Sequence, residues 1–206
     1  MSGPVTFETE LDSVLPQDLP MRGIVVAKAA AHLTLIEQAN RQFNLTRITD
    51  PREAAIKHVL DSVIPWRLFA GAKHVLDAGT GAGFPGIPLA LTLPDVQFTL
   101  AESTHKKARV VGEAVHQLGI RNARIEALRA EEILGTRRFD IVTARAVAPI
   151  ERAVELFKGA TLLLYKGPDA EQEIAEAKRS RVKMEIVMRY ELPDNLGSRT
   201  IVRCEL

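Results

Sequence analysis

The stretch that decides the fold is Val75-Leu-Asp-Ala-Gly-Thr-Gly-Ala-Gly-Phe-Pro-Gly86, in which a short apolar run leads directly into glycines. This order predicts a buried strand over 73–78, a glycine turn, and a helix over about 85–93. In open α/β sheets such a turn brings backbone N–H groups close to a ligand at the carboxyl ends of the strands. The stretch therefore predicts a binding site as well as a fold class.

Two kinds of ligand fit the turn. Its last glycines have the dinucleotide spacing G-x-G-x-x-G, and Glu102 lies at the end of the next predicted strand, so the spacing alone leaves NAD open. Asp77 favours S-adenosylmethionine, because a carboxylate there repels a pyrophosphate and attracts a sulfonium or ammonium group. The complete D-x-G-x-G-x-G pattern is typical of class I methyltransferases and comprises Asp77, Gly79, Gly81 and Gly83. A tight turn that binds nothing is the third alternative.

The chain after residue 70 alternates between apolar strand patterns and helical patterns. Alternation of this kind predicts a parallel sheet with right-handed crossovers. The last two predicted strands have only the turn PDNLGS between them, so we expect them to pair antiparallel. The further strands are predicted over 96–102, 123–127, 139–144, 160–165, 183–191 and 199–205, and the helices over 105–118, 129–134, 150–157 and 169–180.

The chain before residue 70 has helical patterns only. A helix is predicted over 22–44, with an apolar stripe formed by Ile24, Ala27, Ala31, Leu35, Ile36 and Ala39. A second is predicted over 51–65, with Asp50 as N-cap, Pro51 as first residue and Glu53 as capping-box partner. We therefore divide the chain into an acidic segment over 1–20, a helical extension over 21–70 and a catalytic domain over 71–206. The sequence leaves open whether the acidic segment is disordered or packs on the core.

The amino-acid composition limits the possible functions but does not select one of them. The 206 residues are 46% hydrophobic and 26% charged, as in ordinary globular proteins. The net charge is +1, and removing the four acidic residues of the first twenty from the 26 leaves 22 against 27 basic residues. That balance is compatible with nucleic-acid binding but does not require it. A single cysteine, with neither a signal peptide nor a membrane span, predicts a cytoplasmic protein, and the lack of CxxC or HExxH predicts no metal.

A series of motifs makes the prediction more specific than the glycine turn. In chain order these are FNLTRITDP (43–51), KHVLDS (57–62), DAGTGAGFPGIPLAL (77–91), LAESTHKK (100–107), RAEE (129–132), FDIVTARA (139–146) and YKG (165–167). With them the chain resembles the bacterial small-subunit ribosomal RNA guanine-N7 methyltransferases, the RsmG or GidB family, which modify guanine 527 of 16S RNA. The resemblance covers roughly residues 35–205.

The resemblance implies a class I methyltransferase fold, a Rossmann-like, seven-stranded, mostly parallel sheet with an antiparallel C-terminal strand and a small helical N-terminal extension. It implies S-adenosylmethionine as cofactor and small-subunit ribosomal RNA, or an assembling small subunit, as partner; we expect a monomer and no membrane contact. The predicted cofactor site comprises Asp77, Gly79, Thr80, Gly81, Gly83, Phe84, Glu102, Ser103, Thr104, Ala130, Glu131 and Arg145.

The chemistry of guanine N7 limits which side chains are needed. Its lone pair is free at neutral pH, so an in-line displacement of the methyl group needs orientation and placed charge, and no general base. Arg145, Asp61, His58 and Asn44 are our candidates for substrate positioning, with Arg145 donating to guanine O6 or contacting cofactor and Asp61 accepting from the opposite edge of the base. Each also has a plainer interpretation: a local helix pair for His58 and Asp61, a helix C-cap for Asn44, a surface ion pair for Arg145.

Three other functions stay open from the sequence. A methyltransferase of this fold could act on another RNA or on a small molecule. The glycine spacing also suits an NAD-binding oxidoreductase, and a ribosome-binding protein could keep the cofactor fold without catalysis.

Overall fold

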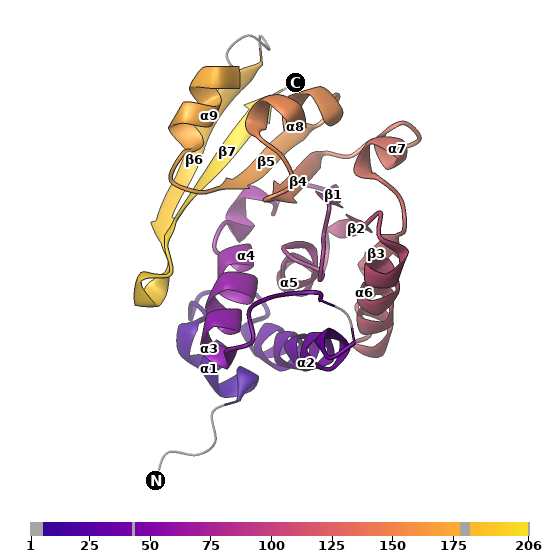
Figure 1. The fold of residues 1–206 in the computed structure, drawn as a ribbon, viewed down its shortest axis with the longest axis vertical. Helices are drawn as coiled ribbons and strands as arrows, with labels where there is room; N and C mark the ends of the chain where they lie inside the picture. Colours follow the sequence, from indigo (N-terminus) through magenta and orange to yellow (C-terminus); the bar gives the residue numbers. More distant parts are fainter. Residues whose placement is uncertain (1–5, 43, 178–181, 206) are drawn as a thin grey trace.

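The computed structural model describes residues 6–42, 44–177 and 182–205 and contains one seven-stranded sheet (Figure 1). Its strand order is β3-β2-β1-β4-β5-β7-β6, and among the described strands β7 runs opposite to the other six, so its pairings with β5 and β6 are antiparallel. The predicted sheet and its antiparallel C-terminal strand are therefore confirmed. The strands are β1 (His74–Ala78), β2 (Gln97–Ala101), β3 (Ala123–Glu126), β4 (Ile141–Arg145), β5 (Thr161–Lys166), β6 (Lys183–Glu191) and β7 (Ser198–Glu205).

Helices cover both faces of this sheet, which explains why the central strands are nearly continuously apolar and buried. These helices follow the strands as predicted. The last of them ends at Glu176, and residues 178–180 of the predicted 169–180 helix lie outside the described residues. The helices of this part are α5 (Gly86–Thr92), α6 (His105–Gln117), α7 (Ala130–Leu134), α8 (Ile150–Leu156) and α9 (Ala170–Glu176), with short 3₁₀ turns η2 (Trp66–Leu68) and η4 (Pro193–Asn195).

The predicted 51–65 helix forms, but it contains an unpredicted π-helical turn. It consists of α3 (Pro51–Ala54), the π-helix η1 (Ala55–Leu60) and α4 (Asp61–Val63). The N-cap is confirmed, because the Asp50 carboxylate accepts from the Glu53 N–H at 2.8 Å. The capping box is wrong in its second half: the Glu53 carboxylate pairs with Lys57 Nζ at 2.7 Å, one helical turn along.

The predicted 22–44 helix is α2 (Arg22–Asn40), which ends four residues early because the Asn40 side chain accepts from the N–H groups of Leu45 and Thr46. The predicted stripe is wrong over the first half: Ile24 is 42% exposed, and Ala27 and Ala31 also face outward. Apolar residues surround this half of the helix, so their spacing does not select a face. The buried face consists of Val25, Val26, Ala29, Ala30, His32, Leu33 and Ile36.

The described part of the acidic segment is folded. Residues Phe7–Val14 form α1, which begins with a capping box between Thr6 and Thr9. The buried side chains of this segment are Leu11, Leu15 and Leu19, and they join the same hydrophobic core as Leu89 and Ile201 of the sheet domain. The helical extension and the sheet therefore share one core.

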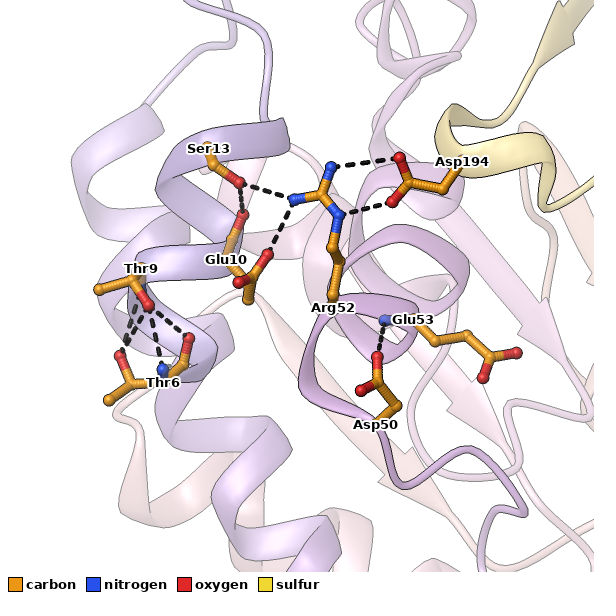
Figure 2. A network of polar contacts seen from close by, with 8 residues as sticks. All are labelled: Thr6, Thr9, Glu10, Ser13, Asp50, Arg52, Glu53 and Asp194. Atoms are coloured by element: carbon orange, nitrogen blue, oxygen red, sulfur yellow. Dashed lines mark hydrogen bonds and ion pairs between the residues drawn. The ribbon is translucent and has the colours of Figure 1, made fainter. Parts of the chain in front are cut away.

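Arg52 links three segments that are distant in the sequence (Figure 2). Its Nη1 donates to Glu10 Oε2 at 2.9 Å on α1, and its Nε donates to Asp194 Oδ2 at 2.5 Å in the turn between β6 and β7. Arg52 Nη2 reaches the other Asp194 oxygen at 3.3 Å, so the pair is bidentate. This contact holds the pKa of the Asp194 carboxyl below its ordinary value. Arg52 thus ties the N-terminal helices to the tip of the β6–β7 hairpin.

Replacing Arg52 with alanine should loosen two segments at once. We expect faster amide hydrogen exchange in both α1 and η4, measured by mass spectrometry, and only a small fall in melting temperature, because the Arg52 and Asp194 side chains are 42% and 46% exposed and salt screens them. The control is Arg67→Ala, which removes one exposed ion pair with Asp18 and a contact with the ring of the adjacent Trp66. Equal exchange in the two variants would contradict the linking role.

Candidate active site

The glycine turn is built around the buried carboxylate of Asp77. Asp77 Oδ2 accepts from Thr80 Oγ1 at 2.6 Å and from the Gly86 N–H at 2.8 Å. Burial raises the pKa of Asp77 to about 6, although these two hydrogen bonds oppose the shift. A Cβ at position 86 would lie 2.1 Å from Leu100 Cδ2 and 2.6 Å from Asp77 Oδ2, so this close approach requires glycine. The conformation of the turn therefore depends on two residues, the Asp77 carboxylate and Gly86, which has no side chain.

A cavity of about 330 Å³ opens beside this turn, at the carboxyl ends of β1 and β2 and against the segment after β4. Gly79 lies in it with a φ of +68°, and a Cβ there would come within 2.9 Å of Val147. Five of the predicted cofactor residues line the cavity: Gly79, Glu102, Ser103, Ala130 and Glu131. The lining that the sequence did not predict comprises Ala78, Ala101, Leu128, Arg129, Val147, Ala148, Arg152, Leu156 and Phe157.

The side chains of this cavity fit an adenosine-containing ligand. Glu102 is 7% exposed, and its Oε1 accepts from the Thr104 N–H at 2.7 Å. Within the described residues Oε2 has no partner, so a carboxylate oxygen remains to accept from ribose hydroxyls. Leu128 and Phe157 supply apolar surface suited to a flat ring.

The other predicted cofactor residues lie outside the lining of this cavity. The side chains of Asp77 and Thr80 are bonded to each other inside the turn, and a Cβ on Gly81 would lie 4.0 Å from the Gly79 carbonyl oxygen. Thr104 takes part through its backbone N–H. Gly83, Phe84 and Arg145 face the helical extension, where a Cβ on Gly83 would lie 3.1 Å from His32. Their contacts with a cofactor remain predictions.

An aromatic stack joins the glycine turn to the helical extension. The Phe84 ring lies parallel to the His58 ring, with centroids 4.6 Å apart, and tilted against His32 at 5.0 Å. His58 Nε2 contacts Thr46 Oγ1 at 3.0 Å, and the Nδ1 atoms of both histidines are buried with no partner in the described residues. Burial lowers the pKa of His32 to about 4 and, together with Arg145, that of His58 to about 3. Both rings are therefore neutral at pH 7.

The Asp61 cluster, formed by Asp61, Arg145, Tyr190 and Arg199, lies next to this stack. Asp61 is 1% exposed; its Oδ1 accepts from Tyr190 Oη at 2.9 Å, and its Oδ2 lies 3.4 Å from Arg145 Nη1 and 3.3 Å from Arg199 Nε. Arg145, at the end of β4, also donates to the Lys57 carbonyl at 2.8 Å. The structure thus brings Arg145 into contact with Asp61, which is buried, whereas the buried His58 contacts Thr46 and Phe84.

Asn44 stands apart from the other predicted residues. It is exposed, and the polar contacts of that region come from Asn40 and Thr46. The sequence analysis missed these two, and also Tyr190 and Arg199. The capping tendency of asparagine could have indicated Asn40. Nothing in the sequence indicates which residues of the closing hairpin reach back to Asp61.

This strand order, with a glycine turn and a ligand-sized cavity at the carboxyl ends of β1 and β2, defines a class I methyltransferase. The chain belongs to the family of the rRNA small subunit methyltransferase G, because the family model GidB matches residues 25–200. The family resemblance carried by the sequence motifs is confirmed.

Curated relatives carry the same name. The chain is 61% identical to the ribosomal RNA small subunit methyltransferase G of Solibacter usitatus, over 96% of this chain and 99% of that protein. It is 40% identical to the protein of that name from Xylella fastidiosa, over 86% and 85% of the two chains.

Solved structures share the fold. The O-methyltransferase from Bacillus cereus in complex with SAH aligns over 96% of both chains with a TM-score of 0.58 and 15% identity. The O-methyltransferase TomG from Streptomyces achromogenes in complex with SAM aligns over 85% of this chain and 90% of that one, with a TM-score of 0.53 and 19% identity. At such low identity these likenesses show the fold alone.

The two neutral histidines make stability depend on pH. Below their ordinary pKa of 6.5 the unfolded chain binds protons that the folded chain does not, so the free energy of unfolding falls between pH 7 and pH 5, by about 2 kcal/mol for each histidine. Asp77 acts in the opposite direction: its pKa is raised in the folded protein, so the folded chain binds the proton first as the pH falls. This stabilisation offsets about 1 kcal/mol of the loss caused by the histidines. Urea unfolding at the two pH values measures the difference.

The variant that isolates this effect is His32→Gln. In it the free energy of unfolding should fall less between pH 7 and pH 5, because one of the two histidine contributions is gone. His116→Gln is the control, since His116 is exposed on α6. A loss between pH 7 and pH 5 that is as large in His32→Gln as in the unsubstituted protein would contradict the assignment.

Proposed function

We propose that this protein transfers a methyl group from S-adenosylmethionine to N7 of a guanine in small-subunit ribosomal RNA. The observation that carries the proposal is the cavity beside the glycine turn, which Glu102 lines and which has Arg145 at the adjacent strand end. The name that the family and its curated relatives share supports the RNA substrate. S-adenosylmethionine would supply an electrophilic methyl group on a sulfonium.

The cofactor would be held by residues of three strand ends. Glu102 would accept from the ribose hydroxyls, Ala130 and Glu131 would contact the adenine, and Gly79 would let the backbone approach the ligand. Asp77 acts through its charge from within the turn, because its carboxylate is bonded to Thr80 and Gly86. Among the described residues, no group of three acidic, histidine or cysteine side chains could hold a metal ion.

Guanine would be held by donors that leave N7 free. Both hydrogen bonds of Arg145 in the described structure come from Nη1, so Nε and Nη2 can donate to guanine O6. A fork onto both O6 and N7 would block the nucleophile, and a single contact to O6 avoids this. N7 attacks with its own lone pair, so these residues orient the base and no side chain removes a proton.

The Asp61 carboxylate has a different role from the one its position in the sequence suggests. Both of its oxygens are engaged, and the side chain is 1% exposed, so it is not free to accept from the guanine edge. We assign Asp61 to holding Arg145, and His58 to supporting Phe84 and Thr46. Asn44, exposed on the segment 44–49, stays our candidate for a direct contact with RNA.

We further propose that the enzyme acts as a monomer in the cytoplasm, where small-subunit RNA is assembled. No helix in the described ranges is long and apolar enough to cross a membrane.

The first experiment is methyl transfer from labelled S-adenosylmethionine to small-subunit RNA and to particles from cells that lack the activity. Borohydride and aniline cleave the chain at N7-methylguanine, so a single new cleavage identifies atom and position together. Labelled RNA without cleavage would show a methyltransferase that acts at another atom. No labelling, despite tight cofactor binding, would overturn the RNA substrate and leave a methyltransferase of small molecules.

Glu102→Gln tests the cofactor site separately from the RNA. The variant keeps the shape of the side chain and loses its charge, so we expect at least about tenfold weaker binding of S-adenosylhomocysteine by calorimetry. The control is Glu113→Gln, on the exposed face of α6, with unchanged affinity. NAD is titrated in parallel; if NAD binds and S-adenosylhomocysteine does not, the cavity belongs to an oxidoreductase.

A further inference from the structure

The π-helical turn η1 frees a carbonyl for Arg145. In an α-helix the Asp61 N–H would bond to the Lys57 carbonyl, four residues back. Here it bonds to the Ile56 carbonyl, five residues back, and the Lys57 carbonyl accepts from Arg145 Nη1 at 2.8 Å. Such turns occur often at functional sites. The change of helical register therefore creates an acceptor on the helix face that meets the end of β4.

The same turn places Asp61 as the second acceptor. Its Oδ2 lies 3.4 Å from Arg145 Nη1, so one nitrogen of the guanidinium is shared between the Lys57 carbonyl and this carboxylate. Arg199 Nε competes for the same oxygen at 3.3 Å. A carboxylate with two cations on one oxygen is free to rotate toward either, unless its other oxygen is fixed.

Tyr190 fixes that other oxygen. Its hydroxyl lies 2.9 Å from Asp61 Oδ1 and 3.1 Å from the Asp61 backbone carbonyl, so it contacts both ends of one residue. Burial and the nearby Asp61 carboxylate raise the pKa of Tyr190 well above its ordinary value, so the hydroxyl keeps its proton and stays a donor. Tyr190 belongs to β6, at the far edge of the sheet from the glycine turn.

We propose that Tyr190 is a positioning residue for methyl transfer, which fixes Asp61 so that Arg145 presents Nε and Nη2 to the guanine. This inference rests on the proposed function, in which Arg145 contacts the base. Tyr190 itself contacts neither the cofactor cavity nor, in the described structure, Arg145. Its effect passes through one carboxylate to one guanidinium.

The chain offers a matched control for Tyr190→Phe. Tyr165, on β5, donates its hydroxyl to the Ser62 carbonyl at 2.7 Å, one residue beyond Asp61 on the same helical segment. Tyr165 pairs with Arg145 between β5 and β4, and Tyr165→Phe removes a buried hydrogen bond between sheet and helix while both Tyr190–Asp61 hydrogen bonds stay in place. Both variants should lower the melting temperature. Only Tyr190→Phe should lower kcat on the RNA substrate, by about tenfold, with KM for S-adenosylmethionine unchanged.

A double variant tests whether the effect passes through Arg145. In an Arg145→Lys background the fork of donors is already lost, so adding Tyr190→Phe should reduce kcat by less than about twofold further. A full tenfold further loss would show that Tyr190 acts by another route and would overturn the proposal. An unchanged kcat in the single Tyr190→Phe variant, with a melting temperature as low as that of Tyr165→Phe, would overturn it too.

A measurement without substrate separates this proposal from the proposed function. In protein labelled at arginine, the Arg145 Nε–H signal should lose order on the picosecond-to-nanosecond scale in Tyr190→Phe and keep it in Tyr165→Phe. If the unsubstituted protein methylates no RNA, the substrate assignment fails while this comparison still decides whether Tyr190 orders Arg145. An equally ordered Arg145 in both variants would overturn the inference whatever the substrate is.

Discussion

The active site depends on the hydrogen bonds of the buried Asp77 carboxylate. By accepting from Thr80 and from the N–H of Gly86, Asp77 bends the chain back after β1 and sets the start of α5 beside the cavity at the strand ends. The side chain is fully buried, which disfavours its charge, and the raised pKa shows that two hydrogen bonds compensate only in part. Burying the Asp77 carboxylate therefore destabilises the folded protein but places a negative charge next to the cavity.

The second constraint is the junction between helical extension and sheet. Phe84 leaves the glycine turn and packs between His32 and His58, so the extension rests directly on the cofactor turn. The π-helical register of η1 and the Asp61 cluster then tie the same extension to β4, β6 and β7. A shared core makes the two parts one unit, so base and cofactor would be held by groups that cannot shift independently.

Local patterns predicted the sheet, its antiparallel end and the glycine turn, whereas the family resemblance supplied most of the five predicted residues that line the cavity. The sequence did not predict the buried face of α2, where apolar residues surround the first half, nor the π-helical turn, which Arg145 helps to stabilise from 88 residues away. Tyr190 and Arg199 were missed for the same reason: their partner, Asp61, is 129 and 138 residues distant. Interactions of that range leave no periodic signal in the chain.

The position of β7 has a consequence for synthesis. This strand inserts between β5 and β6, and both strands of the final hairpin carry a partner of Asp61. A nascent chain synthesised as far as β5 already contains the glycine turn and Arg145. Its Asp61 carboxylate, however, cannot yet bond to Tyr190 or Arg199. The polar contacts of Asp61 with Tyr190 and Arg199 can therefore form only after β6 and β7 have been synthesised, later than the glycine turn and Arg145.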